Sequence, residues 1–362
     1  MQVKGSFEEG KSLFTNLGRL IFKKDLSLRL RRRLRFAEFV KAEGLGPDDS
    51  SVETGRVVII VGLPRTGSTM ISRLLSADPD SRSPLYWEFA HDSPDVSPSP
   101  DPHSDPRAVP VDQGFSKLGI FSPNGLAEFK KFHNVGAREH EEVTGFTRRF
   151  FFDMETALMT PEAQRERLEW QRSSSVDRSF LASYLRVFLK HQRRRSPGEF
   201  WVLKSPAVTS WLEEYKAAFP NAVFVFTSRD PKSVVPSLCG LNEVALSLKY
   251  DYRKAKDLAP IGEGVIGRVA GYAKAQGEFI AANPSISMNI PYQRMVQDPI
   301  AAARGIYEFS GREFTGEVEE KMRRHALNNK KGKHGRAEYS LEKFGLSGEQ
   351  VDAAFPGYEK FL

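Results

Sequence analysis

The stretch of this chain that most limits its fold is RVVIIVGLPRTGSTMISRLL, which runs from residue 56 to residue 75. It begins with the β-branched run 57–61, and such an uninterrupted run is typical of a strand buried on both faces of a parallel sheet. A loop of small and polar residues follows at 62–69, and then apolar residues return at helical spacing, at Met70, Ile71, Leu74 and Leu75. A strand, a loop and a helix in this order direct backbone N–H groups toward an anion. The sequence therefore predicts an α/β protein with a phosphate-binding loop.

The composition of this loop separates it from two commoner kinds of turn. It places one charge and three hydroxyls close together, on Arg65, Thr66, Ser68 and Thr69. Many glycine-containing turns join a strand to a helix, but a purely structural turn does not need so many donors. The loop resembles a P-loop without the Gly-Lys-[Ser/Thr] ending that reaches terminal phosphates and holds magnesium. We therefore expect a phosphate site that works without a metal.

Length and composition indicate an ordinary globular protein. The 362 residues, of which 40% are hydrophobic and 27% charged, are enough for one large α/β domain with helical insertions or for two domains. No apolar run is long enough to span a membrane and no signal peptide is evident, so we expect a soluble, cytoplasmic protein. The single cysteine, Cys239, excludes an intrachain disulfide. A net charge of +7 suits an anionic ligand, but no nucleic-acid-binding signature is present, and we expect no nucleic-acid partner.

We divide the chain into an N-terminal basic helical extension, 1–50, and a main domain, 51–362. The extension has leucines four apart, at Leu26, Leu30 and Leu34, among many arginines. The favoured interpretation is a helix laid over the domain with its arginines in water. The alternative is a peripheral membrane contact through 20–40.

Two further regions are read from their patterns. The proline-rich segment 91–110 has no hydrophobic period and predicts a loop, either a lid over a site or a plain surface loop. Residues 115–195 are mostly helical in pattern and include an amphipathic helix, 179–190, followed by a basic run. We place the acceptor side of the molecule in this helical region.

The second half of the chain has the pattern of parallel β-structure. Strands are predicted at 200–203 and 222–227, with a helix at 211–219 between them, which is a βαβ unit. Lys204 and Arg229 directly follow these strands, where ligands bind in open α/β folds. A helix at 265–282 and a short strand at 286–290 follow.

Two segments that follow predicted strands begin to identify a family. The loop at 62–69 resembles the 5′-phosphosulfate loop of sulfotransferases that use 3′-phosphoadenosine 5′-phosphosulfate (PAPS). The segment 225–231 resembles the family's 3′-phosphate site, in which an arginine and a serine eight residues apart bind the phosphate, as Arg229 and Ser237 are here. Guanidinium groups pair well with phosphate, which suits this second anion site.

Two C-terminal segments extend the resemblance. Residues 292–299 are similar to the family's Tyr-x-x-Leu-x-x-Asp-Pro segment, with Met295 in place of the leucine. The basic run 330–336 resembles the loop that closes over the nucleotide. The order of the four segments, from 57 to 346, resembles most closely the bacterial and algal branch related to tyrosylprotein sulfotransferases. The resemblance implies a P-loop-like three-layer fold with a central parallel sheet, helical insertions and an N-terminal helical extension.

The resemblance also implies a ligand and its contacts. PAPS is the expected co-substrate, adenosine 3′,5′-bisphosphate the expected product, and no metal is expected. The other substrate is expected to bear a hydroxyl, and the acceptor can be a small molecule, a lipid or a glycan. The residues implied to bind the nucleotide are Pro64, Arg65, Thr66, Gly67, Ser68, Thr69, Arg229, Ser237, Lys331, Gly332, Lys333 and His334.

Sulfuryl transfer requires cations to stabilise developing charge and a base to take the hydroxyl proton. Arg65 supplies one cation, and Lys204 resembles the lysine of the family's Lys-[Ser/Thr]-Pro segment. Glu88 is the first choice for the base, because the tyrosylprotein branch has a glutamate shortly after its phosphosulfate loop. The structural alternative for Glu88 is a capping or salt-bridging role. His133, which precedes the cluster His140-Glu141-Glu142, is the rival base.

Two other functions remain open on this sequence. A nucleotide kinase or NTPase has the same architecture, although the missing Gly-Lys-[Ser/Thr] argues against it. A non-catalytic nucleotide-binding module would need neither Lys204 nor Glu88. The oligomeric state is not legible from the sequence.

Overall fold

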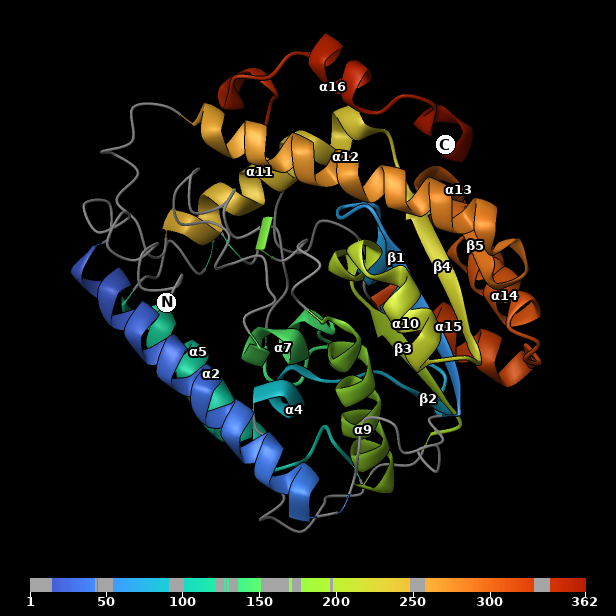
Figure 1. The fold of residues 1–362 in the computed structure, drawn as a ribbon. Coiled ribbons are helices and arrows are strands. Elements are labelled where there is room, and N and C mark those ends of the chain that lie inside the picture. Colours follow the sequence, from blue (N-terminus) through green and yellow to red (C-terminus); the bar gives the residue numbers. More distant parts are fainter. Residues whose placement is uncertain are drawn as a thin grey trace.

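The fold is described from a computed structural model, shown in Figure 1, that covers residues 15–42, 44, 55–90, 101–121, 127, 129, 136–150, 169–170, 177–195, 198–247, 258–328 and 339–362. The elements in chain order are α2 (Asn16–Ala42), β1 (Arg56–Gly62), α3 (Ser68–Leu75), β2 (Ser81–Arg82), α4 (Tyr86–Ala90), α5 (Ala108–Phe121), α7 (Thr144–Thr147), η2 (Arg148–Phe150), α9 (Ser179–Arg195), β3 (Phe200–Lys204), η4 (Pro206–Ser210), α10 (Leu212–Ala218), β4 (Ala222–Ser228), α11 (Pro231–Ser247), α12 (Ala259–Ala282), η6 (Pro284–Ile286), β5 (Ser287–Pro291), α13 (Tyr292–Gln297), α14 (Pro299–Phe309), α15 (Gly316–Asn328), η7 (Glu342–Phe344), α16 (Gly348–Ala354) and η8 (Tyr358–Phe361).

The described strands form one parallel sheet in the order β2-β3-β1-β4-β5. β1 lies in the centre, where Ile60 is opposite Lys204 of β3 and Val225 of β4. This arrangement confirms the predicted α/β fold with a central parallel sheet. It also brings the carboxyl ends of β1, β3 and β4 to one edge of the sheet, which is the edge where ligands bind in such folds.

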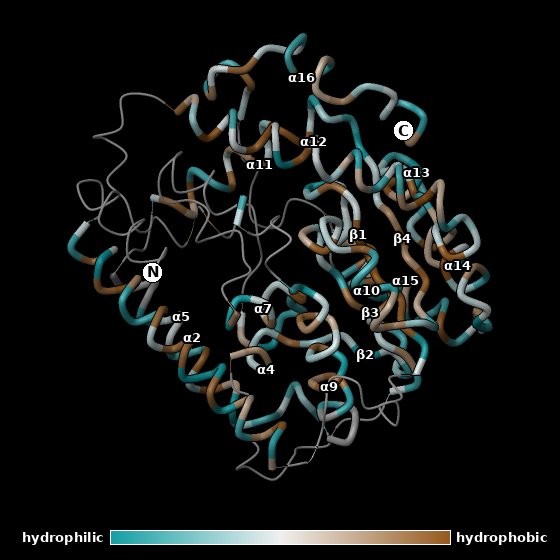
Figure 2. The backbone as a smooth tube through the Cα atoms, in the orientation of Figure 1, coloured by the Kyte–Doolittle hydropathy of each residue, from teal (hydrophilic) through white to brown (hydrophobic). Residues whose placement is uncertain are grey.

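Alternate residues of β1 enter two separate hydrophobic cores. Val57, Ile59 and Val61 pack with residues of α9 and α10 and with Phe279 of α12. Val58 and Ile60 point the other way and pack with residues of α3, α14 and α15. Figure 2 shows the hydrophobic strands enclosed by helices on both sides. Burying each such side chain stabilises the fold by about 1.5–3 kcal/mol, which explains why the run contains no polar residue.

Helix α2 packs on the helical region that begins at 115, and the predicted exposure of its arginines holds for Arg31 and Arg35 but not for Arg29, which is buried. The Phe36 ring packs edge-on against Phe146, with centroids 5.4 Å apart, and also contacts Phe188 of α9. Buried Arg29 pairs with Asp25 at 2.5 Å, and Asp25 also lies 3.9 Å from Arg148 of η2. These contacts hold α2 by both apolar and ionic groups. Among the described helices, α2 included, none combines the length and apolarity that crossing a bilayer requires.

Several predicted boundaries needed correction. The loop expected at 91–110 gives way to α5 at Ala108, since Pro110 falls in the first helical turn, where proline is tolerated; residues 91–100 lie outside the described part. Helix α9 continues through its basic run to Arg195, because arginine is a good helix former. Helix α12 begins at Ala259, earlier than expected, and β5 is shifted by one residue to Ser287–Pro291. The two-residue strand β2 was not predicted, because it is too short to carry a period.

Gly62, at the end of β1, allows the closest approach between β1 and β4. Its φ is +105°, and a Cβ atom there would lie 2.7 Å from the backbone oxygen of Thr227. Backbone cannot move aside as a flexible side chain can.

We expect Gly62→Ala to lower the free energy of unfolding by about 2–4 kcal/mol, from strain and overpacking together. The measurement is urea unfolding. Gly267→Ala on α12, where a Cβ meets nothing within 4 Å, is the control and should be neutral or slightly stabilising. Equal midpoints for the two variants would contradict this packing.

Candidate active site

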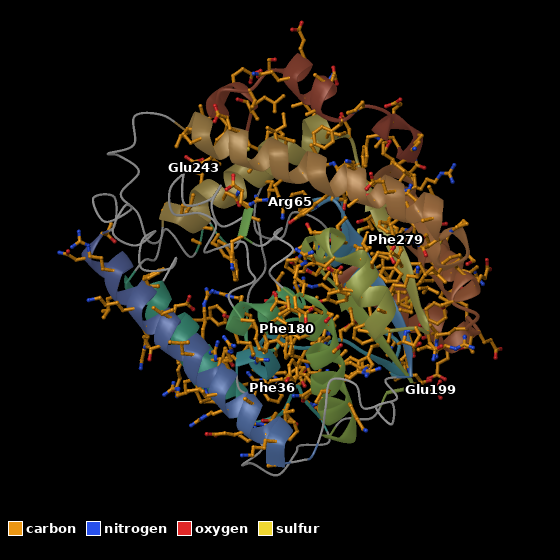
Figure 3. All side chains as sticks on the ribbon, viewed as in Figure 1. Phe36, Arg65, Phe180, Glu199, Glu243 and Phe279 are labelled. Carbon is orange, nitrogen blue, oxygen red and sulfur yellow. The ribbon has the colours of Figure 1, made fainter. Side chains whose placement is uncertain are left out.

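Three cations predicted from separate parts of the sequence lie at one edge of the sheet. Arg65 follows β1, Lys204 ends β3, and Arg229 follows β4. In Figure 3 the Arg65 side chain lies near this end of the sheet, close to α11. The parallel topology therefore brings together distant parts of the sequence, and Arg65 and Arg229 are 164 residues apart.

The loop between β1 and α3 has the conformation of an anion-binding turn. Gly67 has a φ of +89° and caps the N-terminus of α3. Buried Ser68 and half-buried Thr69 begin that helix. The hydroxyl of Thr66 instead serves the loop itself, because it donates to the Leu63 carbonyl at 2.7 Å and also hydrogen bonds to Thr227. Of the three predicted hydroxyls, those of Ser68 and Thr69 therefore lie at the helix N-terminus and that of Thr66 fixes the loop.

Arg65, Ser237 and Arg229 form a cluster that joins the two predicted phosphate sites. Arg65 Nε donates to Ser237 Oγ at 3.1 Å, and Arg229 Nη1 donates to the Arg65 carbonyl at 3.2 Å. Burial lowers the pKa of Arg65, and the neighbouring Arg229 charge also lowers it, against the opposing effect of Tyr339. Arg65 also has a φ of +65°, which is rare for a residue other than glycine. Two arginines whose positive charges oppose each other make the cluster favourable for an anion.

The segment that resembles Tyr-x-x-Leu-x-x-Asp-Pro packs directly against the loop. The Arg229 guanidinium lies over the Tyr292 ring, 4.6 Å from its centroid. A Cβ at Gly67 would lie 2.5 Å from Met295 Cε and 3.1 Å from the Tyr292 ring. Met295, the departure from the family pattern, is fully buried and fills the space under the loop. Tyr292 therefore orients Arg229, and Met295 supports Gly67.

Lys204 is almost completely buried, with 4% of its surface exposed, and it has two partners. Its Nζ donates to Thr69 Oγ1 at 3.2 Å and to Glu142 Oε1 at 2.9 Å. The ammonium group therefore lies between the loop at 62–69 with its following helix and the Glu141-Glu142 pair. Thr69 belongs to the first turn of α3, so the Lys204 ammonium group lies beside the N-terminus of that helix. A cation in this position is suitable for stabilising negative charge that develops near Thr69.

Glu141 and Glu142, in the segment that precedes α7, are neighbouring carboxylates with different surroundings. The segment is clamped to the sheet, because Val143 N–H donates to the Lys204 carbonyl at 3.1 Å and Glu141 N–H donates to the Pro84 carbonyl at 2.9 Å. Burial raises the pKa of Glu141 to about 7, and the nearby Lys204 charge only partly opposes this. Glu142 instead binds the Lys204 ammonium group directly. Acid–base sites typically contain a pair of titratable groups whose different environments give them different roles.

The structure places Glu88 in a buried ion pair, with 1% of its surface exposed. One oxygen pairs with Arg82, and the other accepts the Leu85 N–H at 2.7 Å. Arg82 in turn donates to the Ser83 carbonyl at 2.7 Å. These contacts match the capping and salt-bridging role that the sequence left open for Glu88. Its role as a base remains a prediction.

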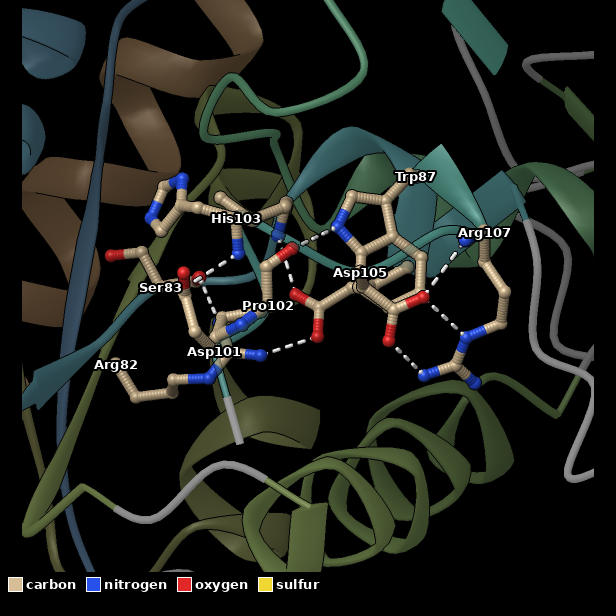
Figure 4. A network of polar contacts seen from close by, with 10 residues as sticks. Arg82, Ser83, Trp87, Asp101, Pro102, His103, Asp105 and Arg107 are labelled. Carbon is tan, nitrogen blue, oxygen red and sulfur yellow. Dashed lines mark hydrogen bonds and ion pairs between the residues drawn. The ribbon is translucent and has the colours of Figure 1, made fainter. Parts of the chain in front are cut away.

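The end of the proline-rich segment covers the Trp87 side chain. Figure 4 shows Trp87 Nε1 donating to the Pro102 carbonyl, at 2.9 Å, and Arg107 bonded to Asp105. The Arg107 guanidinium lies over the Trp87 ring, 4.7 Å from its centroid. Residues 101–107 therefore pack on the helix that carries Glu88. A lid formed by the whole segment 91–110 stays a prediction.

Several predicted residues lie outside the described part of the chain. These are the rival base His133 and the four residues of the basic C-terminal loop, 331–334. Within the described residues, no three His, Cys, Asp or Glu side chains are grouped as metal ligands.

Sequence reasoning missed Thr209 and Thr227, which support the site, and it named Glu142 without its link to Lys204. Thr209 accepts the Gly62 N–H at 2.9 Å and donates to the Gly62 carbonyl at 3.0 Å, which fixes the end of β1. Thr227 binds Thr66, and Glu142 binds Lys204. The sequence signal for Thr209 and Thr227 was their place just after or at the end of a strand, but hydroxyls are common there.

Comparisons with known proteins identify the family and the fold. The chain is similar to the crystal structure of sulfotransferase STF9 from Mycobacterium avium, with 25% identity, a TM-score of 0.82, and coverage of 97% of this chain and 87% of that one. It shares its fold with sulfotransferase STF1 from Mycobacterium tuberculosis H37Rv, at 23% identity, a TM-score of 0.76 and coverage of 98% and 90%. A search of curated proteins found no match. The sequence model of the sulfotransferase family matches residues 57–316, more than half of the chain, and this protein therefore belongs to that family.

Proposed function

We propose that this protein transfers the sulfuryl group of PAPS to a hydroxyl group of a small-molecule, lipid or glycan acceptor. The observation that carries the proposal is that two groups of cationic and hydrogen-bonding side chains lie on one sheet edge. One is the loop that contains Arg65, with the helix N-terminus beside Lys204. The other is Arg229 with Ser237, and Arg65 joins the two groups through its hydrogen bond to Ser237. A nucleotide with a 5′-phosphosulfate and a separate 3′-phosphate needs two such sites.

The residues fit this nucleotide in charge and in shape. Arg229 and Ser237 would hold the 3′-phosphate, and the loop Pro64–Thr69 would hold the phosphosulfate with backbone N–H groups. The tight packing of Gly67 on Tyr292 leaves no space for a side chain on that face of the loop. Residues 331–334 would complete the nucleotide site, as the resemblance implies.

The catalytic roles follow from charge and position. Lys204 donates to the bridging oxygen as its bond to sulfur breaks, and Arg65 stabilises the non-bridging oxygens. Glu142 orients Lys204 through the 2.9 Å contact. Glu141 takes the proton of the acceptor hydroxyl as the new oxygen–sulfur bond forms, because a carboxyl group with a pKa of about 7 is a suitable base near neutral pH. Glu88 is the second candidate base, and it would first have to leave Arg82.

Arg229→Ala should weaken binding of adenosine 3′,5′-bisphosphate by about 30-fold or more, since a charge-assisted phosphate contact is lost. Binding of 5′-AMP, which has no 3′-phosphate, should change much less. Isothermal titration with both nucleotides measures the difference. The control is Arg304→Ala on α14. Like Arg229, Arg304 lies over an aromatic ring, but it lies outside the proposed site, so its removal should leave the binding of both nucleotides unchanged. An equal loss for the two nucleotides would mean that Arg229 does not bind the 3′-phosphate.

The test of the proposed reaction is transfer of radiolabelled sulfuryl from PAPS to a panel of alcohols, phenols and sugars. The expected result is a labelled organic product together with adenosine 3′,5′-bisphosphate. Transfer of the γ-phosphate of ATP in the presence of magnesium, without sulfuryl transfer, would favour the kinase alternative. Tight binding of the bisphosphate without transfer to any acceptor would favour the binding module.

A further inference from the structure

The outward face of α2 is a continuous stripe of exposed residues that the proposed reaction does not use. The stripe follows alternating steps of four and three residues, which keeps it on one side of a helix. Two of its leucines are strongly exposed, Leu20 at 63% and Leu34 at 65%, and Leu30 beside them is 45% exposed. The members of the stripe are Leu20, Lys24, Ser27, Arg31, Leu34, Glu38 and Lys41.

The charge on this side of α2 has one dominant sign. Glu38 is the one exposed acidic residue of the helix, and Asp25 is engaged with Arg29 at 2.5 Å. The exposed cations on or beside the stripe number five, and they are Lys23, Lys24, Arg31, Arg35 and Lys41. They are spread over about 27 Å of helix length, at 1.5 Å per residue. Figure 2 shows the same alternation of hydrophilic and hydrophobic residues along α2.

The opposite face of α2 is fixed to the molecule, so the stripe is presented by a rigid support. Phe22, Phe36 and Phe39 are buried, and the Arg33 guanidinium lies 5.7 Å from the centre of the Phe150 ring. Exposed leucines on an anchored helix cannot turn inward to escape water. They therefore stay available to a partner with an apolar layer.

We propose that the α2 stripe docks the protein on an anionic membrane surface. Lysine and arginine adsorb to anionic headgroups, and the leucines enter the boundary between headgroups and acyl chains. Pairing of two α2 helices through their stripes is unfavourable. The contact between them would contain Lys24, Ser27 and Arg31 at positions where a coiled coil needs apolar side chains. A nucleic acid would contact the cations but would gain nothing from the leucines.

Docking through α2 also defines which side of the protein faces the bilayer. α2 packs through Phe36 on Phe146, in the helix α7 that directly follows Glu142 and Val143. Figure 1 shows α2, α4, α5 and α7 on the same side of the molecule, away from α14 and α15. The segment that carries Glu142, on the predicted acceptor side, therefore lies next to the docking surface.

The test is flotation of the full chain with vesicles of phosphatidylcholine, with or without about 30% phosphatidylserine. We expect at least about 10-fold more bound protein on the anionic vesicles, and loss of that binding as NaCl is raised from about 0.05 M to 0.5 M. The triple variant Lys23→Glu, Lys24→Glu, Arg31→Glu should lose the binding. The double variant Leu20→Ser, Leu34→Ser should weaken it about 10-fold while keeping its salt dependence.

A charge-matched control separates docking from a general effect of net charge. Lys274→Glu, Arg323→Glu, Arg324→Glu changes the net charge by the same amount on α12 and α15, and these three side chains are 59% to 78% exposed. This variant should bind vesicles as the unmodified protein does, and melting curves confirm that all variants fold. Equal loss in the control, equal binding to both vesicle types, or binding to a DNA duplex but not to vesicles would each overturn the proposal.

Discussion

Lys204→Ala is expected to lower kcat for sulfuryl transfer by about 100- to 1,000-fold, which is the usual scale for losing one preorganised donor to developing negative charge. Lys204 is 4% exposed and lies between Thr69 and Glu142, so its charge acts with little screening by water. The nucleotide is held mainly by other groups. Its Michaelis constant should therefore change much less than kcat.

Two variants test this explanation for Lys204. Lys321→Ala removes a lysine that is also paired with a glutamate, Glu317, but on the surface of α15, and it should leave kcat unchanged. Lys204→Arg keeps the positive charge but replaces a point charge by a planar group, and should recover only part of the activity. Pre-steady-state measurement of the chemical step gives the decisive number. A normal rate for Lys204→Ala would remove Lys204 from the reaction.

Glu141→Gln is expected to lower kcat by about 100-fold or more, the usual scale for losing a general base. The pH dependence gives a more specific result. Because burial raises the pKa of Glu141 to about 7, kcat/KM should fall as the pH drops below about 7, when the carboxylate becomes protonated. Glutamine cannot be protonated in this range. The variant should therefore lose this acid limb together with its activity.

The same pKa predicts an opposite effect on stability. A carboxyl group whose pKa is raised in the folded state stabilises that state below its ordinary pKa, and this contribution is lost as the pH rises through about 7. Above pH 7, Glu141→Gln should therefore increase the free energy of unfolding by about 2 kcal/mol, allowing for partial exposure of the side chain. Below pH 4.5 it should have no such benefit. A variant that is less active but more stable is difficult to explain by misfolding.

Matched variants of the two other carboxylates distinguish their roles. Glu88→Gln removes one partner of the buried pair with Arg82, and should lower the free energy of unfolding by about 3 kcal/mol or more. Glu142→Gln should impair the reaction by misplacing Lys204, without removing the acid limb of the pH profile. If Glu88→Gln keeps its melting temperature and loses kcat, while Glu141→Gln stays active, the base is Glu88.

The sheet and its ligand-binding edge could be predicted because their signals are local. The β-branched run at 57–61, the strands before Lys204 and Arg229, and the helix after the loop each carry their own pattern. Parallel topology then brings the strand ends together without further information. The family resemblance predicted that Arg229 and Ser237 share a phosphate site, and in the structure both residues contact Arg65.

The surroundings of the candidate carboxylates could not be predicted, because they depend on contacts between distant segments. The sequence favoured Glu88 as the base over an ion-pairing role. It could not place Arg82 against Glu88, because an arginine six residues away has no fixed position outside a regular element. The pKa of Glu141 depends on how the segment before α7 closes over β3. The membrane alternative for α2 likewise depended on which leucines the core would bury. Leu30 and Leu34, counted in the sequence as one apolar spacing with Leu26, both remain exposed.

The measurement that most directly tests the central claim is the melting temperature of the protein with adenosine 3′,5′-bisphosphate, compared with 5′-AMP and ATP at the same concentration. A ligand that binds only the folded state raises the melting temperature, and at one concentration the tighter ligand raises it more, so the shift reports which phosphates the site requires. The account predicts a large shift with the bisphosphate, a small one with AMP, and no advantage for ATP with magnesium. A shift with ATP alone would contradict a site built for a 3′-phosphate, and with it the proposal that PAPS is the donor.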